Sequence, residues 1–159
     1  MNQLKLCFLV NDVRDKLNSK NHKTTTSVLS KKMMMTPEEV LNSVTEGINA
    51  GDLDSLMTLY EADACFATQP GQLAKSLETI RQSLRGFTDM KNRKFDLKVK
   101  RVLQASDLAL VISEWSFTGT GPDGNPVNIA AKKSTEVLRR QQADGTWRFV
   151  IDNPWGTEY

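Results

Sequence analysis

The first regular pattern along the chain is helical. Thr36 suits an N-cap, Pro37 suits the first helical turn, and Glu38 and Glu39 complement the helix dipole. Apolar residues then recur on one helical face, at Val40, Leu41, Val44 and Ile48. The pattern predicts a first helix over residues 37–50.

Two more helices are expected before the pattern changes. Gly51 ends the first helix, and a second one follows that carries apolar residues as far as Tyr60. A short strand is expected around Cys65. A third helix is predicted over residues 73–85, where Gly86 ends it.

After the third helix the hydrophobic period changes to that of a strand. Four strands are predicted, over residues 94–104, 107–119, 126–142 and 146–153. In the last of them Trp147 and Phe149 alternate with Arg148 and Val150. The short connections suit antiparallel hairpins. Helices followed by long strands predict an α+β fold, with three N-terminal helices packed on one face of a strongly curved antiparallel sheet.

Composition places the chain among ordinary globular proteins. Its 159 residues are 39% hydrophobic and 25% charged, which suits one domain with a buried core. No apolar run approaches the roughly 20 residues that span a bilayer, and the apolar segment before Asn11 lacks the features of a secretory signal. A cytoplasmic location is therefore expected. Cys7 and Cys65 are expected to stay unlinked, and no spacing for a metal or motif for a cofactor is present.

Charge divides the chain into two parts. Residues 1–35 contain seven Lys or Arg and two Asp, a balance of +5, so the remainder carries −3 of the total of +2. The segment from Asn18 to Lys32 is also poor in apolar residues. We expect a basic, disordered leader over residues 1–35 and a folded domain over residues 36–159. Phe8 is the only aromatic residue of the leader, so no nucleic-acid or membrane partner is expected.

The second part of the chain resembles a known superfamily. The matching residues are Asn49-Ala50-Gly51-Asp52-Leu53-Asp54, Leu59-Tyr60, Ala62-Asp63-Ala64, Ile80-Arg81 and Asp144-Gly145-Thr146-Trp147-Arg148 with Asp152. Their order and spacing over residues 37–156 resemble the SnoaL-like and ketosteroid-isomerase-like proteins of the nuclear-transport-factor-like superfamily. The resemblance implies a cone of three helices on a bent sheet, with an internal pocket and a homodimer formed through the sheet.

The superfamily contains unrelated activities, so the resemblance alone does not give a reaction. Steroid isomerisation in this fold needs a carboxylate base and two oxyanion donors, a tyrosine and a neutral carboxylic acid. The resemblance places the tyrosine at Val44 and the base at Thr68, and no acid matches the second donor. Dehydratases and cyclases of the fold use pocket histidines, but the only histidine is His22, outside the matching region. No Asp–Arg–Asp set for epoxide hydrolysis is recognisable either. None of these mechanisms is therefore expected in its known form.

Asp152 is the candidate catalytic residue, because the resemblance implies a pocket acid on the final strand. Burial near Trp155 would raise its pKa into a range useful for proton transfer, with Tyr60 or Thr135 assisting. The alternative is that Asp152 accepts hydrogen bonds from the turn Asn153-Pro154 or faces solvent. Both interpretations stay open.

The candidate ligand-binding residues are Trp115, Phe66, Lys133 and Trp155. Trp115 either forms a pocket wall or packs in the core or a dimer interface. Alternation puts Lys133 and Thr135 on one face of their strand. The opposite face carries Lys132, Ser134 and Glu136. One of these faces supplies polar groups to a pocket, or the strand forms cross-strand ion pairs with Glu114 or Asp152.

Two functions are consistent with the sequence. The first is a SnoaL-like homodimeric domain whose pocket binds a small apolar molecule and, if it is an enzyme, acts by general acid–base chemistry of an isomerase or cyclase type. The second is a non-catalytic binding and association module that uses the sheet for protein contact. Neither function implies a cofactor.

Overall fold

The computed structural model describes residues 34–156. Most of the leader expected over residues 1–35, including Cys7 and His22, lies outside this part, so the domain boundary stays a prediction. None of the helices within the described residues is long and apolar enough to cross a membrane.

Helix α2, Pro37–Ala50, has the bounds that the sequence predicts. The Thr36 hydroxyl accepts a hydrogen bond from the Glu39 amide, and the Glu39 carboxylate accepts one from the Thr36 amide, which completes a capping box. Gly51 follows the helix with a φ of 71°, a left-handed conformation that glycine adopts without the steric cost of a side chain. Local signals are therefore sufficient to define this helix.

Helix α3 is shorter than expected. It spans Leu53–Met57, and Tyr60 is the first residue of strand β1, Tyr60–Gln69, so the prediction that Tyr60 ends a helix is wrong. The Phe149 amide donates a hydrogen bond to the Leu59 carbonyl with an N–O distance of 2.8 Å, and Tyr60 lies opposite Phe149 in the sheet. A strand that is distant in sequence thus draws this segment into the sheet.

Helix α4, Leu77–Thr88, begins and ends later than predicted. The short strand β2, Gln72–Ala74, occupies the positions where the helix was expected to begin, and a second capping box starts α4 at Ser76. Gly86 lies inside the helix instead of ending it. Phe87 packs against the hydrophobic core, and this tertiary contact outweighs the small helical penalty of glycine.

The sheet has six strands in the order β2-β1-β6-β5-β4-β3. The four long predicted strands are present as β3, Lys91–Ala105; β4, Leu108–Thr120; β5, Pro126–Arg140; and β6, Trp147–Asn153. Neighbouring strands are antiparallel except β1 and β6, which run parallel. The predicted α+β class, with three helices on a curved sheet, is confirmed, and the structure adds the one parallel pairing.

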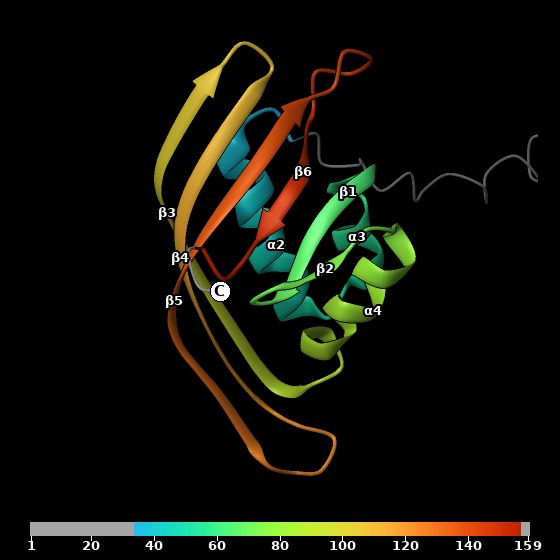
Figure 1. The fold of residues 1–159 in the computed structure, drawn as a ribbon. Coiled ribbons are helices and arrows are strands. Elements are labelled where there is room, and N and C mark those ends of the chain that lie inside the picture. The colour runs from blue at the N-terminus through green and yellow to red at the C-terminus, as the bar shows by residue number, and fades with distance from the viewer. Residues whose placement is uncertain (1–33, 157–159) are drawn as a thin grey trace, which may run out of the picture. The chain divides into compact units, whose positions relative to one another are not determined.

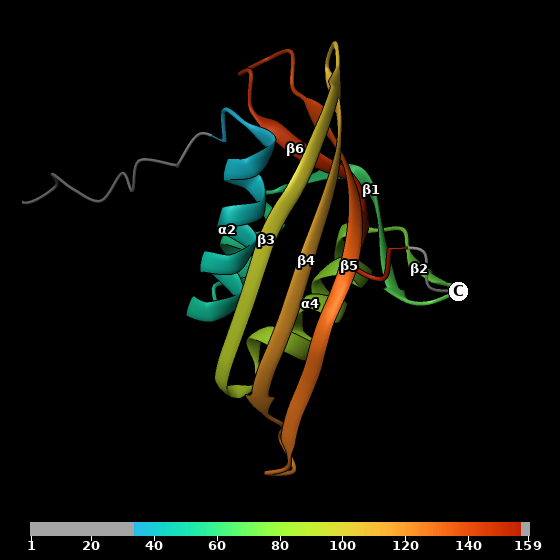
Figure 2. The same cartoon turned by 90° about the vertical axis from the view of Figure 1, so that its left-hand side faces the viewer.

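The three helices lie on the concave side of the sheet (Figure 1). A view from the side shows α2 next to β3, while the long strands curve past the helices (Figure 2). The core fills the space between these layers. Its helical side chains include Val40, Leu41, Ile48, Leu56 and Ile80, and its strand side chains include Phe95, Val111, Phe117, Leu138 and Phe149.

Candidate functional site

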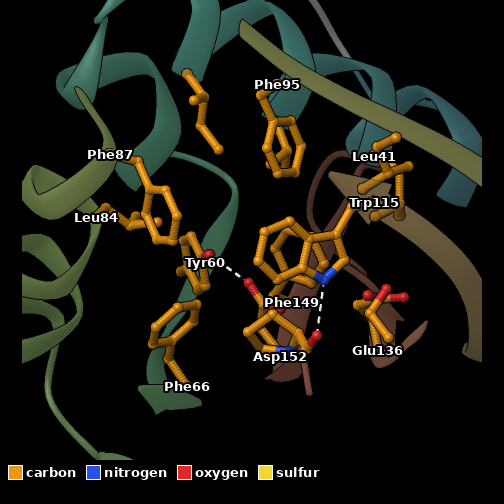
Figure 3. Close-up of a pocket in the computed structure, with 15 residues that line it drawn as sticks. Leu41, Tyr60, Phe66, Leu84, Phe87, Phe95, Trp115, Glu136, Phe149 and Asp152 are labelled. Atoms are coloured by element: carbon orange, nitrogen blue, oxygen red, sulfur yellow. Dashed lines mark hydrogen bonds between the residues drawn. The ribbon is translucent and has the colours of Figure 1, made fainter. Parts of the chain in front are cut away.

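A mostly apolar cavity lies inside this core, between the helices and the inner face of the sheet (Figure 3). Its volume is about 50 Å³, several times the roughly 10–15 Å³ that one water molecule needs. Apolar side chains from α2, α4, β3 and β4 form most of its wall. Its polar lining consists of Tyr60, Ser134, Glu136 and Asp152. The polar groups are thus grouped on β1, β5 and β6.

Two of these polar groups are carboxyls on neighbouring strands. Glu136 of β5 and Asp152 of β6 are direct partners in the antiparallel register, so their side chains point to the same face of the sheet. The exposed fractions are 2% for Glu136 and 8% for Asp152. The Tyr60 hydroxyl donates a hydrogen bond to Asp152 Oδ2 at 2.6 Å. The site is therefore a buried tyrosine and two carboxyls at the edge of an apolar cavity.

Burial gives the two carboxyls different proton affinities. Burial and the nearby Asp152 together raise the pKa of Glu136 to about 8, while hydrogen bonds from Ser134 and Ser113 oppose the increase. Burial raises the pKa of Asp152 to about 6, against the effect of the Tyr60 hydrogen bond. Burial and the Asp152 charge together raise the Tyr60 pKa well above its ordinary value. The higher pKa of Glu136 and the Tyr60 hydrogen bond to Asp152 both favour a state in which Glu136 is protonated and Asp152 is ionised.

A small network of buried hydroxyl groups contacts the Glu136 carboxyl. Ser113 and Ser134 are direct partners on β4 and β5, with 2.7 Å between their hydroxyl oxygens. Ser113 Oγ also lies 3.2 Å from Glu136 Oε2. Both serines are completely buried, so the network fixes the position of the Glu136 carboxyl.

The turn after β6 forms the remaining part of the wall. The indole nitrogen of Trp115 donates to the Pro154 carbonyl at 2.7 Å, and that of Trp155 donates to the Ala67 carbonyl at 3.0 Å. The two indole rings meet edge to face with 6.1 Å between their centroids. These contacts hold Pro154 against the cavity, because they connect the turn to both β1 and β4.

The structure brings together four of the residues that the sequence singles out. Asp152, Tyr60, Trp115 and Phe66 all line the cavity. Trp155 packs on Trp115 just outside the lining.

Thr135 and Lys133 lie elsewhere. They occupy the other face of β5, where Lys133 is exposed and lies opposite Glu114 of β4. The Thr135 hydroxyl accepts a hydrogen bond from the Asn153 side chain at 3.4 Å. The face of β5 that reaches the cavity is the one that carries Ser134 and Glu136. The strand therefore offers the cavity a carboxyl, and not the predicted lysine and threonine.

Glu136 is the main residue that sequence reasoning missed as a site residue. Strand alternation had placed Glu136 with Ser134, but which face points inward depends on the register between β5 and β6. That register puts Glu136 opposite another acid, Asp152. An ion pair between a β5 lysine and Asp152, which the sequence had allowed, does not form.

Within residues 34–156, no three His, Cys, Asp or Glu side chains are grouped in a way that would hold a metal ion. The chemistry that the described residues offer is proton transfer and hydrogen bonding. The donors and acceptors for this chemistry are Tyr60, Glu136 and Asp152.

A comparison with protein families identifies the domain. The model of the SnoaL-like domain matches residues 41–150. The chain belongs to the SnoaL-like domain family. The matched residues include every lining residue of the cavity except Asp152 and Pro154, which lie just beyond them.

The SnoaL-like domain also matches solved structures. A ketosteroid isomerase-like protein from Erwinia carotovora atroseptica is 21% identical, with 72% of this chain and 88% of that chain covered and a TM-score of 0.61. A nuclear transport factor 2-like superfamily protein from Salmonella enterica serovar Typhimurium is 18% identical, with 75% and 89% covered and a TM-score of 0.60. At these identities the similarity establishes the fold and not the reaction. A comparison with curated proteins gives no match.

In this SnoaL-like domain, the two positions that the resemblance assigns to steroid isomerisation carry no suitable group. Val44 lines the cavity with an apolar side chain. Thr68 lies on β1, where its hydroxyl donates to the Gln72 carbonyl at 3.5 Å, outside the cavity lining. The tyrosine and carboxyls that are present come from other positions, namely Tyr60, Glu136 and Asp152.

Proposed function

We propose that this SnoaL-like domain binds a small, largely apolar molecule in the cavity and acts on it by general acid–base chemistry. The observation that carries the proposal is the pair of buried carboxyls, Glu136 and Asp152, on the wall of an otherwise apolar cavity. Apolar walls with a few convergent polar groups are the usual form of a small-molecule site. Titratable groups with strongly perturbed pKa values in such a site are candidates for acid and base.

The size of the cavity limits the ligand. A volume of about 50 Å³ accommodates a molecule of only a few non-hydrogen atoms, well below the roughly 300–1,000 Å³ of pockets for drug-sized ligands. A larger ligand requires movement of a wall. Phe87, which is half-buried near the end of α4, is one of the lining side chains that could move to make that room.

The two carboxyls differ in a way that assigns their roles. Asp152 is mainly ionised at neutral pH and is the base, whereas Glu136 keeps its proton and is the acid. On a bound ketone, a proton would pass from the α-carbon to Asp152 while Glu136 gives its proton to the carbonyl oxygen. The product of this step is the enol, and the reverse transfers restore the ketone.

Hydrogen exchange tests this assignment directly. In D2O the protein should catalyse the exchange of hydrogen for deuterium at the α-carbons of 2-butanone, a small neutral ketone. Mass spectrometry of the ketone measures the rate of this exchange. Loss of a general base typically lowers a rate by about 100-fold or more, so Asp152→Asn should show that loss. Asp96→Asn makes the same change at an exposed carboxylate of β3 and should exchange as fast as the unmodified protein. Equal rates for both variants would refute the acid–base role.

A second candidate function, self-association through the sheet, is favoured by one further observation. An apolar row crosses the convex face of the sheet, which none of the three helices covers (Figure 2). The row consists of Leu103, Leu110, Val137, Ile151 and Cys65, each the direct partner of the next in the strand register. Leu103, Leu110 and Ile151 are 46%, 37% and 44% exposed. Exposed apolar rows of this kind mark interaction surfaces, and a homodimer would bury this one.

A further inference from the structure

The titratable groups that line the cavity are all acids. Its titratable lining residues are Tyr60 from β1, Glu136 from β5 and Asp152 from β6. The lining residues from α2, α4, β3 and β4 carry no titratable group, and none of the described lining residues is Lys, Arg or His. The Asp152 carboxylate therefore has no positive partner among the described residues.

One oxygen of Asp152 is available to a ligand. Oδ2 accepts the hydrogen bond from Tyr60, while Oδ1 makes no hydrogen bond with any described residue. The Asp152 side chain lines the cavity and is only 8% exposed, so its carboxyl is a nearly buried acceptor at the cavity wall.

The apolar wall has a property that suits a positive ligand. Its aromatic members are Tyr60, Phe66, Phe87, Phe95, Trp115 and Phe149. Aromatic rings attract ammonium groups through their quadrupole, and the attraction is stronger in sites that exclude water. Figure 3 shows these rings around the same space as the Asp152 carboxyl, with Phe87 on one side and Trp115 on the other.

We propose that the polar group of the ligand is an ammonium group, which donates a hydrogen bond to Asp152 Oδ1 while its carbon chain lies against the aromatic rings. This inference rests on the binding part of the proposed function, because it names the class of molecule that the same cavity binds, and in such a complex Asp152 acts as a binding group and not as the base. A neutral alcohol can make the hydrogen bond but not the charge interaction. A carboxylate or phosphate would meet the Asp152 carboxylate with no compensating cation among the described lining residues.

Three compounds with three carbon atoms each separate these cases: propylamine, 1-propanol and propionate. Binding is measured at pH 7 by chemical-shift changes of cavity residues in NMR titrations. Both compounds can donate a hydrogen bond to the Asp152 carboxylate, but only the ammonium group adds a charge interaction. Propylamine should therefore bind about tenfold more tightly than 1-propanol, which corresponds to about 1.4 kcal/mol. Propionate should bind more weakly than both.

The outcomes distinguish the inference from the proposed function. If 1-propanol or propionate binds as tightly as propylamine or more tightly, the ammonium inference is wrong and small-molecule binding stands. If none of the three shifts the cavity residues, both fail.

Two variants test whether the preference for propylamine over 1-propanol depends on the charge of Asp152. Asp152→Asn keeps an acceptor for Tyr60 but removes the charge, so it should bind propylamine and 1-propanol equally. Asp96→Asn should keep the tenfold preference, because the Asp96 side chain is exposed on β3, away from the cavity.

A measurement on the unmodified protein covers the case in which Asp152→Asn does not fold, as judged by circular dichroism. Between pH 7.5 and pH 5 the affinity for propylamine should fall as Asp152 takes up a proton, while that for 1-propanol should stay constant. A propylamine affinity that does not change with pH would overturn the inference.

Discussion

Glu136 and Asp152 lie directly opposite each other on β5 and β6, and both carboxyls are buried at the wall of one cavity. Two buried acids in adjacent register positions cannot both ionise without strong repulsion. One proton on the pair removes that repulsion, and the hydrogen bond from Tyr60 favours the charge on Asp152. The sheet register thus creates an acid and a base from two carboxyls that the sequence places far apart.

The stability of the fold should fall as the pH rises from about 4.5 to 8. The pKa of Glu136 is raised from 4.5 to about 8, so across this window the folded state holds a proton that the unfolded state has lost. Such a group destabilises the folded state with increasing pH, here by about 5 kcal/mol at most. Glu136→Gln removes the group, so the variant should gain stability relative to the unmodified protein between pH 5 and pH 8. Urea denaturation at both pH values measures the gain.

The matched control for this experiment is Glu78→Gln on the exposed side of α4. It should show the same difference from the unmodified protein at pH 5 and at pH 8. If Glu136→Gln behaves in the same way as this control, the pKa of Glu136 is not raised in the folded protein.

Tyr60→Phe should raise the pKa of Asp152 above about 6. The Tyr60 hydroxyl stabilises the charged carboxylate through its 2.6 Å hydrogen bond, so its removal favours the protonated form. NMR titration of the Asp152 carboxyl carbon measures the change. The variant should also lose about 1–3 kcal/mol of unfolding free energy, because Oδ2 is left without a partner. An unchanged or lower pKa would show that the hydroxyl does not control the charge.

Phe87→Ala should enlarge the cavity and widen its ligand range. Phe87 contacts Trp115 and Phe117 edge to face, with centroid distances of 6.2 and 5.1 Å. Its removal should lower the unfolding free energy by about 3 kcal/mol and increase binding of the neutral fluorescent probe N-phenyl-1-naphthylamine. Val127→Ala, away from the cavity lining, should not increase probe binding. Equal fluorescence for both variants would place Phe87 outside the path of the ligand.

Leu110→Glu should prevent self-association. Leu110 lies in the apolar row on the convex face, between Leu103 and Val137, and a charge there would be buried without a partner in a sheet-to-sheet dimer. Sedimentation velocity should show a dimer for the unmodified protein and a monomer for the variant. Glu78→Lys, on α4, changes a surface charge on the opposite layer and should leave the dimer intact. A monomeric unmodified protein would refute association through this face.

Local sequence signals predicted a large part of the fold. The capping residues Thr36 and Glu39 define α2, and period-two alternation located the four long strands. Errors occurred where a distant partner decides the conformation. Tyr60 continues an apolar pattern typical of a helix, but pairing with Phe149 of β6 makes it the start of a strand. Glycine often ends a helix, but Gly86 lies inside α4, because packing of the residues that follow it keeps the helix intact.

The candidate site, like the fold, depends partly on local sequence and partly on contacts between distant segments. The sequence alone determined an α+β fold with helices before strands and an acid, Asp152, near the end of the last strand, because these depend on local periodicity and on residue order. Only the tertiary structure decided which face of β5 points inward, since a shift of one residue in strand register exchanges the two faces. In the observed register Glu136 lies beside Asp152, and Lys133 is exposed at the surface. The proton-sharing pair therefore arises from strand pairing across the sheet, which no local pattern in the chain specifies.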